Sequence, residues 1–357
     1  MKNYTLTLHR LLACTLPLLG GGAVLAQAPA PQTPTLRQNA VPSWIAVPNQ
    51  EQARDIAETV YNTWRQSMIN SNLAAWQSST AQSRQIKVRN MVVSQKREFP
   101  RSLFGQEATP PALVSLRYVG ALTGANGYTL ACTYIGKADL GIGGKPANTA
   151  LVLLFVHENG KWKYDQLRFF NLSHLPQVAE RLSKKDLGVL KEQDGFHPYE
   201  KIPAIPPPCP APQYIAKVFV DAPGRAVDMT INGISHHNFE DVRLAEIVSG
   251  GLRRGNNTIR YTIRDISKPA EGAKTPPLAI GLFIMPETEG NVPGRCFEYI
   301  VGEGDPTVSG NYTFTVSDDT IRAMNPKNPK GVQPAPFHPV PLKQKPEETK
   351  QPPSSAK

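Results

Sequence analysis

The sequence predicts an α+β domain, in which helices pack on a curved antiparallel sheet, followed by an all-β sandwich and a disordered Pro/Lys-rich tail. Apolar residues first recur at helical spacing and then alternate with a period of two. Clusters of the chain's 34 prolines separate the compact parts. Proline fixes φ and removes a backbone donor, so these clusters interrupt helices and central strands. A length of 357 residues is enough for two domains of ordinary size.

Composition sets the boundaries of six segments. They are a signal peptide at 1–26, a Pro-rich linker at 27–48, the α+β domain at 49–195, a second Pro-rich linker at 196–212, the β-sandwich at 213–323 and the tail at 324–357. Lys2 and Arg10 precede an apolar stretch, and Val24-Leu25-Ala26 offers small residues for cleavage. We therefore expect an exported protein, periplasmic or extracellular. Lipidation of Cys14, within "LLAC", is an alternative form of attachment to the envelope.

The net charge of +10 is concentrated in the segment 83–101 and in the tail, and the remainder is close to neutral. This distribution and the predicted export argue against a nucleic-acid partner. The basic segments are interpreted as a solvated helix face and a soluble tail. Contact of the tail with anionic surfaces such as lipopolysaccharide, lipid headgroups or acidic glycans is the alternative.

The α+β domain opens with a helix whose start is marked by Asn49 and Gln52, the pattern of a capping box. The apolar face of this helix comprises Ile56, Ala57, Val60, Tyr61, Trp64 and Met68. Further helices are predicted at 73–76 and 84–96, strands at 113–122, 128–136, 149–158 and 161–171, and a helix start at Ser173 with Pro176.

The last two strands form a hairpin around Asn159-Gly160, which suits a type I′ turn. Regular pairing from this turn places Tyr164, Gln166 and Arg168 on one face, among apolar neighbours. Buried polar groups need partners, so we expect these three, with Tyr134 of a neighbouring strand, to line a ligand-binding cavity. The alternative is that they bond to the backbone or to a partner subunit.

Helices followed by a curved antiparallel sheet that ends in "HENGKWKYDQ" resemble the NTF2-like superfamily, including its SnoaL-like members, over about 50–172. The resemblance implies a cone with an internal cavity and a homodimer through its sheet. Family members include isomerases, cyclases, dehydratases and non-catalytic binding modules. Catalytic members use an Asp or His base and a Tyr within the cone. Regular pairing places Asp165 on the opposite face of the sheet from Tyr164, and it places His157 at the hairpin mouth. We therefore assign no catalytic residue.

The second domain carries six predicted strands, at 214–220, 226–232, 257–263, 278–285, 297–301 and 311–316. The run "DMTING", a loop and "LRRGNNTI" resemble a galactose-binding-like jelly roll. His236 and His237 lie in the predicted loop, where adjacent side chains point apart, so no metal site is assigned. "GIGGKPAN" at 141–148 lacks the spacing of a phosphate-binding loop, and no cofactor is predicted.

Signal cleavage would leave three cysteines in an oxidising compartment. Cys132 shares a face of its predicted strand with Tyr128, Leu130 and Tyr134 and is expected to be a buried thiol. We predict a disulfide between Cys209 and Cys296; two free thiols are the alternative.

These observations predict an exported bacterial envelope protein with a non-catalytic binding or assembly role. Its partner would be an envelope protein, a glycan or a small hydrophobic ligand. One alternative is an NTF2-like enzyme, an isomerase, dehydratase or hydrolase-like protein, acting on a small hydrophobic molecule in the cone. Another is a carbohydrate-binding module formed by the sandwich, which an exposed aromatic shelf would favour.

Overall fold

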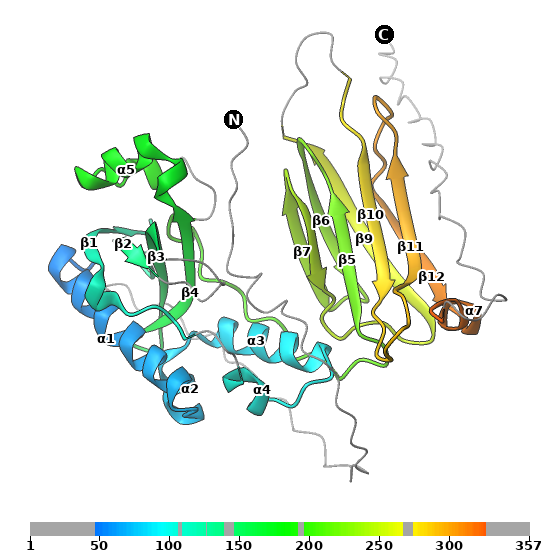
Figure 1. The fold of residues 1–357 in the computed structure, drawn as a ribbon, viewed down its shortest axis with the longest axis horizontal. Coiled ribbons are helices and arrows are strands. Elements are labelled where there is room, and N and C mark those ends of the chain that lie inside the picture. The colour runs from blue at the N-terminus through cyan, green and yellow to red at the C-terminus, as the bar shows by residue number, and fades with distance from the viewer. Residues whose placement is uncertain are drawn as a thin grey trace, which may run out of the picture. The chain divides into compact units, whose positions relative to one another are not determined.

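The computed structural model describes residues 47–105, 109–125, 127–138, 146–191, 196–266 and 274–325. The chain divides into two compact units, of which the first ends at Pro210 and the second begins at Ala211 (Figure 1). The predicted signal peptide and nearly all of the first linker and the basic tail lie outside the described residues. No helix of the described part is long and apolar enough to cross a membrane.

The helices of the first unit are α1 (Gln50–Ile69), α2 (Leu73–Ser79), α3 (Gln82–Ser94), α4 (Arg101–Phe104), α5 (Pro176–Ser183) and α6 (Gly188–Lys191), with short 3-10 turns at Leu113–Ser115 and Leu172–His174. The predicted capping box of α1 is present, because the Asn49 side chain accepts from the Gln52 amide and the Gln52 side chain accepts from the Asn49 amide. The prediction that Ser173 caps α5 is wrong. Ser173 lies in the preceding 3-10 turn, where the Asn171 side chain accepts from its amide.

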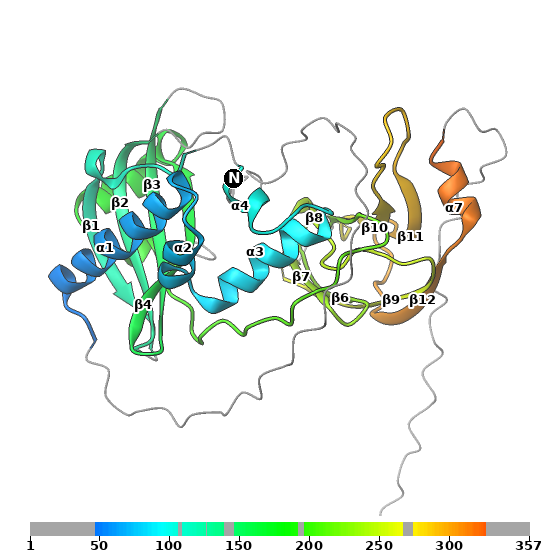
Figure 2. The same cartoon turned by 90° about the horizontal axis from the view of Figure 1, so that it is seen from below.

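Four antiparallel strands form the sheet of the first unit, in the order in which they occur along the chain. They are β1 (Arg117–Thr123), β2 (Thr129–Ala138), β3 (Ala147–Glu158) and β4 (Lys161–Asn171). Helix α1 runs alongside these strands (Figures 1 and 2), and its Ala53, Ala57 and Tyr61 form a core with one face of the sheet. The other face packs against α5, α6 and Phe196. The sheet is therefore covered on both sides.

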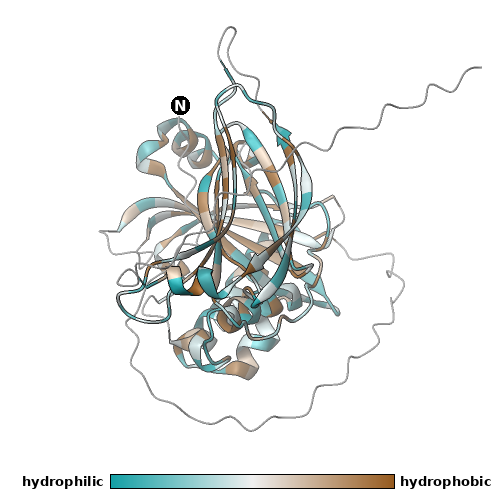
Figure 3. Ribbon diagram, turned by 90° about the vertical axis from the view of Figure 1, so that its right-hand side faces the viewer, coloured by the Kyte–Doolittle hydropathy of each residue, from teal (hydrophilic) through white to brown (hydrophobic). Residues whose placement is uncertain are grey.

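The described residues of the second unit form eight strands: β5 (Ala216–Asp221), β6 (Arg225–Ile231), β7 (Ser235–Glu240), β8 (Arg243–Ile247), β9 (Gly255–Asp265), β10 (Leu278–Ile284), β11 (Gly294–Val301) and β12 (Gly310–Val316). They form two antiparallel sheets, with strand orders β11-β10-β5-β8 and β12-β9-β6-β7. Hydrophobic and hydrophilic residues alternate along these strands (Figure 3). The inward residues of both sheets share one core, as in a β-sandwich. A short helix, α7 (Asp318–Ala323), follows β12.

Strands β7 and β8 occupy the segment that was expected to be a loop. The inward residues of β7 are Ser235, His237 and Phe239, of which the first two are polar. The outward residues of β7 are polar too. The polar inward residues hide the alternation of hydrophobic and polar residues that marks other strands. Asn232 and Gly233, both at positive φ, make the tight turn that leads into β7.

Candidate functional site

A β-bulge in β4 decides where the predicted site residues lie. Phe155 pairs with Tyr164, as regular pairing from the Asn159-Gly160 turn requires, but Leu154 then pairs with Gln166. Asp165 is the extra residue of the bulge, and Val152 pairs with Arg168. An extra residue moves every following side chain to the opposite face. The prediction that Tyr164 shares a face with Gln166 and Arg168 is therefore wrong.

Tyr164 and Tyr134 lie on the face that packs against α1, and both are buried. The Tyr164 ring centroid is 4.2 Å from that of Trp64 and 5.7 Å from that of Tyr61. Burial raises the pKa values of both predicted tyrosines well above that of a free phenol. Aromatic rings thus fill the space beside Tyr164, and these two residues form a core rather than the wall of an open cavity.

Gln166 and Arg168 lie on the opposite face of β4 and are half-buried. The Arg168 Nε atom is enclosed by protein and has no hydrogen-bond partner. Burial lowers the pKa of Arg168, whereas Tyr199 and Asp165 act in the opposite direction. The structure therefore separates the four predicted residues into two pairs on opposite sides of the sheet.

Asp165, which sequence reasoning left out of the site, is its most constrained polar residue. Only 2% of its surface is exposed. Its Oδ2 accepts a 2.5 Å hydrogen bond from the Tyr199 hydroxyl, and its Oδ1 accepts a 3.4 Å bond from the Ser83 hydroxyl. The Tyr199 hydroxyl is also 3.5 Å from Gln166 Oε1. No periodic signal marks Tyr199, because it lies in a segment whose prolines predicted a linker.

Lys87 interacts electrostatically with this carboxylate and with two further cations, Arg84 and Arg168. Arg84 and Lys87 lie three residues apart on α3, and Arg168 lies on β4. Partial burial lowers the pKa of Lys87, the Asp165 carboxylate opposes this effect, and the positive charges of Arg84 and Arg168 add to it. We call Arg84, Lys87, Arg168, Asp165 and Tyr199 the β4 cluster.

The end of the predicted linker packs on α3 and holds one of the three described cysteines. The Cys209 amide donates to Asn90 Oδ1 over 2.9 Å, and Arg89 Nη1 donates to the Cys209 carbonyl over 2.9 Å. The Cys209 thiol lies 3.4 Å from the Ser94 hydroxyl. These bonds keep Cys209 buried within the first unit, although its segment was predicted to be a linker.

The predicted disulfide between Cys209 and Cys296 is not present: both are free cysteines, as is Cys132. Cys296 belongs to the core of the sandwich, and its thiol donates to the Gly294 carbonyl over 3.5 Å. Burial raises the pKa of Cys296 to about 12. Cys209 is thus enclosed against α3 of the first unit and Cys296 in the core of the second, and sequence position alone did not reveal this. Cys132 is buried, as predicted.

A polar trio links the two sheets of the second unit. His237 Nε2 is 2.7 Å from the Ser235 hydroxyl, and His237 Nδ1 is 2.7 Å from Glu246 Oε2. Ser235 and His237 belong to β7 and Glu246 to β8, so the trio joins the edge strands of opposite sheets. The spacing is that of a serine, histidine and carboxylate relay. However, Ser235 is only 1% exposed and its hydroxyl accepts from the Ser249 amide, which indicates a structural role.

His236 points away from this trio, as expected for adjacent residues in extended chain. It is exposed, and its Nδ1 is 3.0 Å from the Thr230 hydroxyl. Within the described residues, no group of three or more His, Cys, Asp or Glu side chains is placed to hold a metal ion.

The outer surface of the sheet β11-β10-β5-β8 carries an exposed aromatic pair. Phe219 of β5 is 46% exposed, and its ring centroid lies 5.4 Å from that of Phe283 of β10, in an edge-to-face arrangement. Gly281 pairs with Phe219, and a Cβ atom at Gly281 would lie 2.6 Å from the Phe283 ring. The Phe283 ring therefore rests on the glycine backbone. Ile300, exposed on β11, extends the apolar surface. We call Phe219, Gly281, Phe283 and Ile300 the aromatic face.

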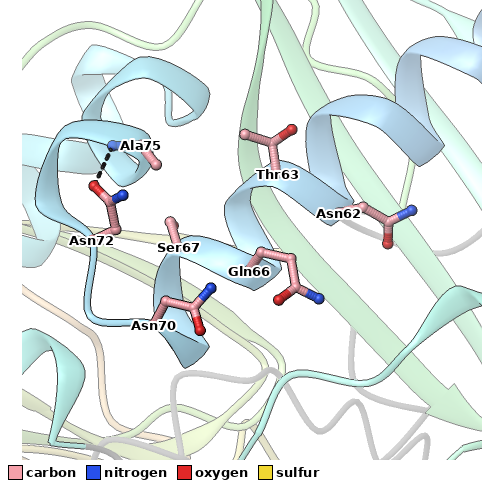
Figure 4. Close-up of a pocket in the computed structure, with 7 residues that line it drawn as sticks. All are labelled: Asn62, Thr63, Gln66, Ser67, Asn70, Asn72 and Ala75. Atoms are coloured by element: carbon pink, nitrogen blue, oxygen red, sulfur yellow. Dashed lines mark hydrogen bonds between the residues drawn. The ribbon is translucent and has the colours of Figure 1, made fainter.

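A groove of about 400 Å³ lies between the end of α1 and the start of α2 (Figure 4). It is lined by Asn62, Thr63, Gln66, Ser67, Asn70, Asn72 and Ala75. Several of these polar groups serve their own helices: Asn72 caps α2 through the Ala75 amide, and the Thr63 and Ser67 hydroxyls donate to carbonyls of α1. A second groove, of about 460 Å³, lies beside the β3–β4 turn and includes Glu158. Neither groove contains a predicted site residue.

No protein-family model, curated protein or solved structure matches this chain. The function of the chain is therefore inferred from two features of its structure, the β4 cluster and the aromatic face.

Proposed function

We propose that this chain is an exported bacterial envelope protein with a non-catalytic binding role, and that its sandwich binds a neutral glycan on the aromatic face. The observation that carries the proposal is the exposed, edge-to-face pair of Phe219 and Phe283. Contiguous exposed apolar surface rimmed by polar residues is a mark of an interaction site. Sugar rings present apolar C–H faces that stack on such rings, while their hydroxyls bond to polar side chains at the rim.

The charges at the rim of the aromatic face support a neutral ligand. Arg295 pairs with Glu298 over 2.8 Å, and Arg243 pairs with Asp221 over 3.5 Å. The charges within each pair neutralise each other, and Lys217, which lies opposite Phe283 on β5, adds one positive charge, so the rim offers both donors and acceptors with only a weak net field. A polyhydroxyl ligand uses both kinds of group, whereas a charged polymer would favour a rim of one sign.

We further propose that the first unit is an NTF2-like cone that serves as a scaffold. Helices packed on a four-stranded antiparallel sheet, closed by the β3–β4 hairpin, support this fold. The rings of Tyr61, Trp64 and Tyr164, packed together between α1 and the sheet, support a non-catalytic role for the cone.

Affinity electrophoresis of the full chain in gels that contain laminarin, xylan or hydroxyethyl cellulose tests the glycan proposal. At least one of these neutral polysaccharides should retard the protein. Phe219→Ala should weaken binding about tenfold, which is ~1.4 kcal/mol and within the range of one aromatic contact. Gly281→Ala should also weaken binding, because the added methyl group displaces the Phe283 ring without removing it. Val292→Ala, which changes an exposed apolar residue elsewhere, is the matched control.

Two results would count against this assignment. The first is migration that no polysaccharide of the panel alters. The second is a dimer in solution that Phe219→Ala dissociates, since the aromatic face would then be an interface between two copies of this chain.

An enzyme acting on a small hydrophobic molecule is the second candidate, and the Asp165–Tyr199 pair favours it. A carboxylate held 2.5 Å from a phenol places a base beside a proton donor, two groups that take part in general acid–base catalysis. The test is deuterium exchange from solvent into a cyclic ketone, followed by NMR. Exchange that is faster than in buffer and is lost in Asp165→Asn would support an isomerase-like activity, and exchange at the buffer rate would reject it.

A further inference from the structure

The β4 cluster contains more positive charge than its single carboxylate can neutralise. We infer that Arg84, Lys87 and Arg168 form a binding site for an oxyanionic group, either a phosphate or a carboxylate of a ligand. The inference concerns the first unit and is independent of the glycan proposal for the second. Three features carry it: the bonds already made by Asp165, the unpaired state of Arg168, and the spacing of the two cations on α3.

Asp165 is already committed to other partners. Its Oδ2 accepts from Tyr199 and its Oδ1 accepts from Ser83. Arginine pairs best with a carboxylate through two parallel N–H···O bonds, which needs both oxygens in the plane of the guanidinium. Within the described residues, Asp165 and Arg168 make no ion pair within 4 Å. The carboxylate therefore moderates the positive charge without using the donors of Arg168.

Arg168 has a hydrogen-bonding capacity that the protein leaves unused. Its side chain is half-buried, its Nε is shielded from solvent, and no hydrogen bond to that atom is formed. A shielded donor without a partner destabilises the folded state, and more so when it is charged. Such a cost is expected where a ligand completes the bonding. The planar fork of arginine matches both carboxylate and phosphate oxygens.

Helix α3 supplies the other two cations from one side. Residues three apart on a helix are neighbours on its surface, so Arg84 and Lys87 point in similar directions. The Ser83–Asp165 bond fixes this end of α3 against β4. Arg84 is half-buried, and Lys87 is exposed although protein surrounds part of its side chain, so an anion can reach both from solvent. Asp165 and the nearby Glu158, which accepts from the Gln82 amide at the start of α3, are two carboxylates against three cations, so an excess of one positive charge remains.

The test is urea unfolding of the full chain, followed by tryptophan fluorescence. All four tryptophans, Trp44, Trp64, Trp76 and Trp162, precede residue 211, so the signal reports the first unit. Unfolding is measured at pH 7 and constant ionic strength, in chloride, in millimolar inorganic phosphate and in millimolar glucuronate. A ligand that binds only the folded state raises the urea midpoint. The phosphate and glucuronate arms distinguish the two sources of the oxyanion.

Arg168→Met is the decisive variant, because methionine keeps most of the side-chain volume and removes the charge. Without ligand it should be at least as stable as the wild type, since an unpaired, half-buried charge is removed. With ligand its affinity should fall at least tenfold. Arg117→Met, which removes an exposed cation on β1, should retain the full response. Lys87→Met changes an exposed residue and should also weaken the response, so it serves if Arg168→Met does not fold.

Three outcomes would overturn the inference. One is a midpoint that neither phosphate nor glucuronate raises. Another is a rise of equal size in Arg168→Met and the wild type, because phosphate can stabilise proteins through exclusion from their surface. The third is a folded Arg168→Met that is clearly less stable without ligand, which would show that Arg168 is a structural anchor for Asp165.

Discussion

Replacing Tyr199 by phenylalanine tests whether the Asp165 bond holds the linker segment to the sheet. The substitution removes one hydroxyl and leaves the ring, so the apolar packing of Tyr199 beside Phe196 and its neighbours is unchanged. The buried Asp165 carboxylate loses its 2.5 Å bond and keeps only the 3.4 Å bond from Ser83. The change is therefore confined to one donor at one buried charge.

The expected cost follows from the nature of that bond. Hydrogen bonds to charged groups contribute about 1.5–3 kcal/mol. In Tyr199→Phe the Oδ2 atom of Asp165 loses its donor. Because Asp165 is almost fully enclosed, we expect the upper part of this range, about 2–3 kcal/mol. Ser83→Ala removes a longer, weaker bond and should cost about 0.5–1 kcal/mol.

Urea unfolding measured by tryptophan fluorescence is the appropriate assay, because it reports the first unit. A double-mutant cycle with Asp165→Asn isolates the coupling between the two side chains, which should account for most of the Tyr199→Phe cost. A loss below about 0.5 kcal/mol, or additive effects in the cycle, would refute the role assigned to this bond.

Three further predictions concern other parts of the chain. Burial raises the pKa of Glu158, so the ionised carboxylate lowers the stability of the fold once the pH rises through that pKa. In urea unfolding, Glu158→Gln should be at least as stable as the wild type at pH 7, and the difference should vanish below about pH 4. A variant that is less stable than the wild type at pH 7 would contradict this. His237→Phe keeps a ring but loses both bonds of the inter-sheet trio, and calorimetry should show a loss of about 2–3 kcal/mol; an unchanged transition would mean that the trio contributes nothing. Intact-mass counting of the unfolded, non-reduced mature protein should find three free thiols, at Cys132, Cys209 and Cys296, whereas a single free thiol would restore the disulfide that the sequence predicted.

Local chemistry explains which elements the sequence could predict. The capping box at Asn49 and Gln52 and the positive φ at Asn159 and Gly160 depend on residues close together in the chain. The six strands predicted in the sandwich are apolar enough to show their alternation. In each case the information lies within one element, so the sequence by itself determined the longer helices of the first unit and most strands of both units.

The site depended on contacts between distant segments, and the sequence could not supply them. The bulge at Asp165 is stabilised by Ser83 and Tyr199, which are 82 and 34 residues away, and it reverses the face on which Gln166 and Arg168 lie. In the same way, β7 has polar inward residues because Glu246, on the opposite sheet, satisfies His237. A buried polar group can occupy a core position only where its partner is in place, and only the tertiary structure brings those partners together.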